Sequence, residues 1–118
     1  MSSPEATDNA RRRGRRERVI DVLVRHGLTA RAAEILYRLG LSLRRRMLQG
    51  PDPRQWTECA GMIESHTGQR LGPVATGDHR SVDVGLQLHA ARGRHAANVH
   101  THPGNSSFSP DDVTFPTM

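Results

Sequence analysis

The sequence predicts an α/β domain in which an N-terminal helical segment packs against a mixed β-sheet. Three observations lead to this prediction. An amphipathic stripe with helical spacing runs through residues 30–47. Short apolar segments bounded by turn-forming residues follow it, and they are typical of strands at residues 56–64, 81–89 and 96–102. The helical stripe precedes all of these strands, which favours a helix that covers one face of a sheet.

The first 50 residues divide into a charged tail and a helical segment. Residues 1–18 are polar, charged and without periodicity, so we expect a disordered, arginine-rich tail. A short helix follows in the helical segment 19–50, and Gly27 fits its end. Thr29 is a candidate N-cap for a second helix. The apolar stripe of that helix consists of Ala32, Ile35, Leu36, Leu39, Leu43 and Met47. The two helices also suit half of a helix-turn-helix, but a helix packed on a sheet is the interpretation that we prefer.

Residues 51–118 are expected to form the rest of the domain. Besides the three strands named above, residues 69–77 suit an edge strand because Pro73 cannot donate a ladder hydrogen bond. Ser109 is a candidate N-cap for a further helix. Asp112 is then the return partner of a capping-box-like pair.

Composition excludes several classes of protein. The chain has 118 residues, of which 35% are hydrophobic and 3% aromatic, so it holds one small domain with a thin core. Cys59 is the only cysteine, which excludes an internal disulfide and a multi-cysteine zinc finger. The sequence has neither an apolar run of membrane-span length nor a signal-peptide pattern. We therefore expect a cytoplasmic protein that makes no membrane contact.

Positive charge is concentrated in the N-terminal half. All 17 basic residues are arginine. Residues 1–50 contain 12 arginines and 5 acidic residues, a net charge of +7, whereas residues 51–118 contain 5 arginines and 7 acidic residues, a net charge of −2. The arginine run within residues 11–18 suits either a solvated tail or a weak, salt-dependent contact with nucleic acid.

Two histidines near the C-terminus have the spacing of metal ligands. His100 and His102 project from the same face of a strand, where their imidazoles can converge on a metal such as zinc. Asp112 can supply a third ligand and leave the fourth position to water, as in catalytic zinc sites. The activated water needs a general base, for which Glu58 and Glu64 on the first strand are the candidates.

The segment ECAGMI, which begins at Glu58, and the segment HTHPGNSSFSPDD, which begins at His100, together resemble the JAMM signature of the MPN+ (JAB domain) zinc metalloproteases of bacterial type. The resemblance implies an MPN/JAB, cytidine deaminase-like fold and a zinc-dependent hydrolase of peptide or isopeptide bonds. It implies that His100, His102 and Asp112 bind zinc, that Glu58 is the catalytic base, and that Ser109 hydrogen-bonds the oxyanion. Family substrates include peptides and ubiquitin-like or sulfur-carrier proteins.

The resemblance covers about residues 54–115 and departs from the family in two respects. Ser109 and Asp112 each lie one residue closer to His102 than in eukaryotic members. The sequence ends six residues after Asp112, so we expect the C-terminal helix and strand of the fold to be missing, or supplied by a partner or a second copy. Two other functions stay open: a truncated, noncatalytic JAB remnant that acts through contacts, and a small arginine-rich nucleic-acid-binding protein.

The candidate site residues also have simpler interpretations. The two histidines suit exposed strand positions, and Ser109 and Asp112 suit helix capping alone. Glu58 suits a solvent-facing position, in which case Glu64 would be the base. Cys59 should lie on the strand face opposite Glu58 and pack in the core.

Overall fold

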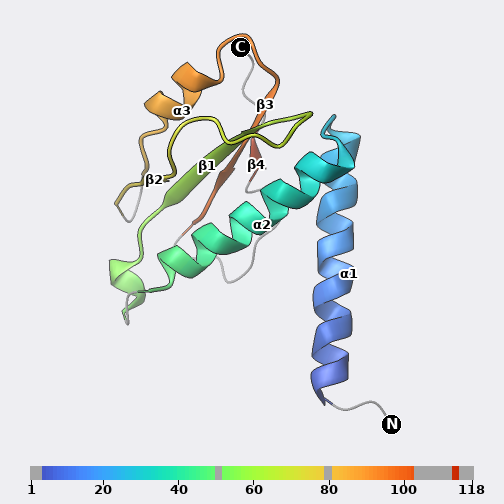
Figure 1. Ribbon diagram of the computed structural model, residues 1–118. Coiled ribbons are helices and arrows are strands. Elements are labelled where there is room, and N and C mark those ends of the chain that lie inside the picture. The colour runs from blue at the N-terminus through green and yellow to red at the C-terminus, as the bar shows by residue number, and fades with distance from the viewer. Residues whose placement is uncertain (1–3, 50–51, 79–80, 103–112, 115–118) are drawn as a thin grey trace.

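Helices lie on both faces of a four-stranded antiparallel sheet (Figure 1). The computed structural model describes residues 4–49, 52–78, 81–102 and 113–114. The helices are α1 (Pro4–Arg25), α2 (Ala30–Met47) and α3 (Gly85–Ala90), and a 3₁₀ turn spans Pro53–Gln55. The strands are β1 (Cys59–Glu64), β2 (Ala75–Thr76), β3 (Ala96–His100) and β4 (Val113–Thr114). The predicted α/β class is confirmed at this level.

Helix α2 covers one face of the sheet, as its apolar stripe predicted. Thr29 caps it, with the Ala32 amide donating to Thr29 Oγ1 at 3.1 Å. Leu36 and Leu43 are fully buried in a cluster that includes Ile63 of β1 and Val99 of β3. Burial of each large aliphatic side chain contributes about 1.5–3 kcal/mol. This packing fixes β1 and β3 under the helix, and it favours the helix-on-sheet interpretation over a helix-turn-helix.

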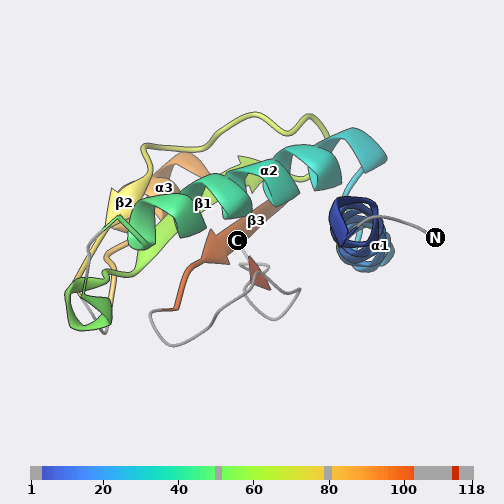
Figure 2. The ribbon, with the colours of Figure 1, turned by 90° about the horizontal axis from the view of Figure 1, so that it is seen from below.

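Helix α1 corrects the prediction of a disordered tail, because residues 4–18 are helical. Arginine is among the better helix formers, a property that an argument from charge and low hydrophobicity overlooks. The helix is fixed by its C-terminal half, where Val19 and Leu23 are buried in the same cluster as α2. It ends before Gly27, which has φ +104° and closes the turn into α2. Figure 2 shows α1 beside the layer that α2 forms on the sheet.

The sheet has the strand order β2-β1-β3-β4. Each strand pair that the structure describes is antiparallel, which corrects the expectation of a mixed sheet. The central pair aligns Ala60 with His100 and Gly61 with Val99. The short strand β2 lies at the edge, within the predicted edge-strand segment.

Helix α3 replaces the strand predicted at residues 81–89. The alternation of Val and Leu there does not mark a buried face, since Leu86 is 71% exposed and Leu88 37%. Glycine is a poor strand former, so Gly85 disfavours a strand here. The Gly85 amide donates a hydrogen bond to the Asp83 carboxylate at 2.8 Å, which favours a turn into the helix. The residue buried on this helix is the polar Gln87.

The helix predicted at residues 109–113 is wrong at Val113, the one residue of that segment that the structure describes. Residues 109–112 lie outside the described residues. Val113 is the first residue of β4 and pairs with Val99 in β3. It joins the hydrophobic cluster under α2, so burial of its side chain favours the strand here.

Gly61 is required by the close approach of α2 to β1. A Cβ atom at this position would lie 2.7 Å from Leu39 Cδ2 and 3.2 Å from Leu39 Cγ. Leu39 is itself buried, so its side chain has little room to move. We expect Gly61→Ala to lower the free energy of unfolding by about 1–3 kcal/mol through overpacking.

The matched control is Gly14→Ala, in the exposed part of α1, where the added Cβ would meet only Arg18 at 3.5 Å. We expect this change to raise stability by up to about 1 kcal/mol, because alanine is the better helix former. Urea midpoints of the two variants should shift in opposite directions. Equal shifts would contradict the proposed contact between Gly61 and Leu39.

Candidate functional site

The end of β3 is fixed against the start of β1 by Thr101. The Thr101 amide donates to the Cys59 carbonyl at 2.8 Å, and the Cys59 amide donates to Thr101 Oγ1 at 2.9 Å. Both residues are buried, Thr101 at 5% exposure. This reciprocal pair extends the β1–β3 ladder beyond His100, so the histidine segment has a set position relative to Glu58.

Because Thr101 points into the core beside Cys59, the two histidines that flank it project from the other face. The ring centroids of His100 and His102 lie 6.4 Å apart, with an angle of 53° between the ring planes. Two histidines that share a tetrahedral zinc ion hold their ring centroids roughly 5 Å apart, given zinc–nitrogen distances of about 2.0–2.1 Å. The observed spacing is wider, so the two rings would have to rotate towards each other to share a zinc ion.

Glu58 lies at the same end of the sheet as the histidines. Its Oε1 is 3.8 Å from His102 Nδ1, and its side chain is 16% exposed, whereas that of His102 is 46% exposed. The distance exceeds that of a direct hydrogen bond and leaves the two groups within the reach of one bridging water molecule. The Glu58 backbone is anchored to the next loop: its amide donates to the Asp78 carbonyl at 2.7 Å, and its carbonyl accepts from Gly77 at 2.8 Å.

Glu64 lies at the opposite end of β1 and has a structural role. Its carboxylate accepts hydrogen bonds from the Thr67 amide at 2.7 Å, the Thr67 hydroxyl at 2.6 Å and the His66 amide at 3.1 Å. These bonds, that of the Thr67 hydroxyl first, lower the pKa of Glu64 to about 2. Glu64 pairs with Ala96, four residues along β3 from His100, a separation of roughly 13 Å. The geometry therefore favours Glu58 over Glu64 as a partner of the histidines.

A buried polar network supports the histidine face of the sheet. Gln87 of α3 donates through Nε2 to the carbonyls of Ala60 at 2.9 Å and Pro73 at 2.8 Å. Asn98, two residues before His100 and so on the same face, donates to Gln87 Oε1 at 2.8 Å. Sequence reasoning missed these residues. An available signal was the polar Asn98 within an otherwise apolar strand.

Ser109, Asp112 and Cys59 are the remaining residues that the sequence singled out. Ser109 and Asp112 lie outside the described residues. Within the described ranges, no group of three or more histidine, cysteine, aspartate and glutamate side chains has the arrangement of a metal site. Cys59 is fully buried in the core under α2, as predicted.

Comparisons with protein-family models, with curated proteins and with solved structures find no match for this chain. No helix in the described part of the chain is long and apolar enough to span a bilayer.

Proposed function

We propose that this chain is a zinc-dependent hydrolase of peptide or isopeptide bonds, with a site of the JAMM type in an MPN/JAB-like fold. The observation that carries the proposal is the approach of Glu58 to His102, at 3.8 Å. These residues are far apart in the sequence, and the resemblance to the JAMM signature independently assigns them the roles of base and ligand. Antiparallel pairing of β1 with β3 supports the same grouping.

The proposed metal ligands are His100, His102 and Asp112. Two imidazoles and one carboxylate form a donor set that suits zinc and leaves a coordination position open. Val113 pairs with Val99, and these two residues are the chain neighbours of Asp112 and His100. A bound zinc ion would supply Lewis acidity to polarise a carbonyl group and to bring the pKa of a water molecule towards neutrality.

The protein's own groups would move the protons. The Glu58 carboxylate accepts a proton from the attacking water as the new carbon–oxygen bond forms. Glu58 then transfers that proton to the amine that leaves as the carbon–nitrogen bond breaks, which returns the carboxylate to its starting state. Ser109 would donate a hydrogen bond to the developing oxyanion. Thr101 acts as a positioning residue, because its two bonds to Cys59 fix the segment that carries both histidines.

The substrate class follows from the resemblance: a peptide, or an isopeptide bond of a ubiquitin-like or sulfur-carrier protein. The half-buried Glu58 and the more exposed His102 suit a site at the protein surface, where a large substrate could reach it.

Zinc binding by the purified full chain tests the proposal. We expect about one zinc ion per chain after dialysis, measured by elemental analysis. Zinc should also raise the thermal midpoint, because a ligand that binds the folded state stabilises it. Absence of bound zinc from the folded protein, at zinc concentrations that saturate ordinary catalytic sites, would remove the hydrolase proposal.

A further inference from the structure

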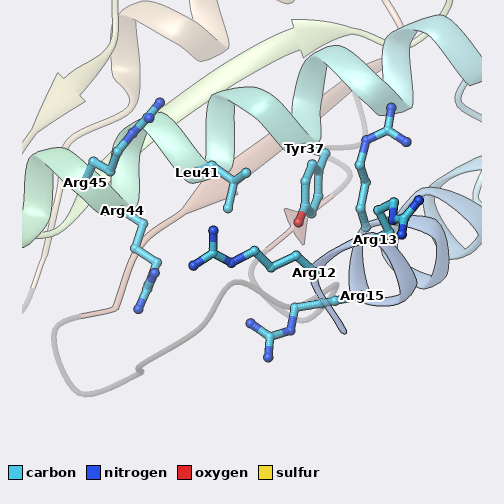
Figure 3. Close-up of a pocket in the computed structure, with 8 residues that line it drawn as sticks. Arg12, Arg13, Arg15, Tyr37, Leu41, Arg44 and Arg45 are labelled. Carbon is cyan, nitrogen blue, oxygen red and sulfur yellow. The ribbon is translucent and has the colours of Figure 1, made fainter. Parts of the chain in front are cut away.

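A pocket of about 540 Å³ lies in the angle between α1 and α2, away from the histidine face of the sheet (Figure 3). The described residues that line it are Arg12, Arg13, Arg15, Arg16, Tyr37, Leu41, Arg44 and Arg45. On α2 the lining residues recur at helical spacing and share one side of the helix. Figure 3 shows Arg12 and Arg15 extending from α1, and Arg44 extending from α2, towards the same space.

The lining is strongly positive. Among the described residues that line it, six are arginines, whose guanidinium groups are positively charged, and none is acidic. Arg16 is neutralised by Glu34 of α2, with a distance of 2.6 Å between Arg16 Nη2 and Glu34 Oε1. That ion pair links the two helices, whose packing is set mainly by the buried Val19 and Leu23 of α1. Arg12, Arg13 and Arg15 lie close together on α1 and bring like charges to the pocket, a repulsion that an anionic ligand would reduce.

The floor of the pocket is apolar. Tyr37 and Leu41 supply it, and Tyr37 is held in place because only 7% of its surface is exposed. Because so little of Tyr37 is exposed, a nucleobase would instead lie against Leu41 and stack on the planar guanidinium groups, which also match phosphate oxygens in geometry. The volume lies within the range of small-ligand pockets, about 300–1,000 Å³.

We propose that this pocket binds a nucleotide unit, either free or within a single-stranded nucleic acid, with its phosphate on the arginines and its base against Leu41 and a guanidinium plane. This site is independent of the proposed zinc centre. An anionic membrane is a poorer fit, because the exposed large apolar side chains in the described residues are Val24, Leu86 and Leu88, none of which lines the pocket. An acidic peptide would satisfy the arginines but would leave the apolar floor unused.

The test compares two double variants of the full chain that remove the same charge from α1. Arg12→Gln with Arg15→Gln changes the pocket, and Arg11→Gln with Arg18→Gln changes two exposed arginines of the same helix that do not line it. Binding is measured by fluorescence anisotropy with a labelled single strand of about 12 nucleotides, at several salt concentrations. Circular dichroism checks that both variants keep the helical content of the unmodified chain.

We expect the pocket variant to bind the strand roughly tenfold more weakly, with a shallower dependence on salt, and the control variant to bind nearly as well as the unmodified chain. Unlabelled AMP that displaces the strand would identify a free nucleotide as the ligand. Displacement by unlabelled strand alone would identify nucleic acid. Equal weakening in both variants would overturn the proposal. Tripolyphosphate, polyglutamate and anionic vesicles carry negative charge but no nucleobase. If any of them displaced the labelled strand as well as the unlabelled strand does, the proposal would also be overturned.

Discussion

Replacement of Glu58 by glutamine is expected to lower the rate of hydrolysis by about 10²–10⁴-fold while zinc remains bound, because a general base contributes a factor of that size. Glutamine has the shape of glutamate but cannot accept the proton of the attacking water. The measurement is the rate at which the zinc-loaded chain releases amines from a pooled library of peptides and lysine-linked isopeptides. Zinc content is determined on the same samples.

The matched control is Glu64→Gln, the same substitution at the other end of β1. We expect it to leave hydrolysis and zinc content unchanged and to lower stability, because the Glu64 carboxylate holds the turn after β1 through hydrogen bonds from the Thr67 amide, the Thr67 hydroxyl and the His66 amide. The pKa of Glu64 is about 2 in the folded chain against an ordinary value of 4.5, so this stabilisation is present above pH 4.5. It is lost as the pH falls towards 2. Between pH 4.5 and 2 the stability of Glu64→Gln should therefore fall less than that of the unmodified chain.

Loss of zinc affinity in Glu58→Gln would assign Glu58 a different role, that of orienting His102. The carboxylate lies near Nδ1 of His102, and a carboxylate that orients a ligating imidazole typically improves metal affinity by about 10–100-fold. If Glu58→Gln lost zinc affinity to that extent and hydrolysis only in proportion, Glu58 would be a positioning residue. Unchanged hydrolysis with zinc retained would remove Glu58 from the proposed mechanism.

The elements that the sequence predicted well are those in which one periodicity was unambiguous. The stripe from Ala32 to Met47 has only helical spacing, and the apolar segments at β1 and β3 are bounded by turn residues. Two of the corrected predictions, those for residues 81–89 and 4–18, failed because local pattern and tertiary packing disagreed. Alternation at residues 81–89 suggested a strand, yet the structure buries Gln87 by giving it hydrogen-bond partners and exposes Leu86. The charge of residues 4–18 suggested disorder, yet the anchored half of α1 continues through them.

The candidate site was predictable to the extent that its chemistry lies in short motifs. The pairs Glu58 with Gly61 and His100 with His102 are visible in the sequence itself. The supporting contacts are not, because they depend on which strands pair. Thr101 gains its role only when β3 lies beside β1, and Gly61 is explained only by the position of Leu39 on α2. The arginine pocket likewise requires the angle between α1 and α2, which no local pattern encodes.

The second large effect is expected at the metal ligands. His100→Ala should weaken zinc binding by more than the roughly 10–100-fold that loss of an outer-shell partner costs, because it removes one of three proposed donors. His89→Ala is the matched control, since His89 is an exposed histidine on α3. Titration of zinc against a competing chelating dye, with unfolding followed in parallel, separates loss of the site from loss of the fold. If both alanine variants bound zinc as tightly as the unmodified chain, the metal would be held elsewhere. The closeness of Glu58 to His102 would then be an ordinary surface contact between strand ends, and the hydrolase proposal would lose its foundation.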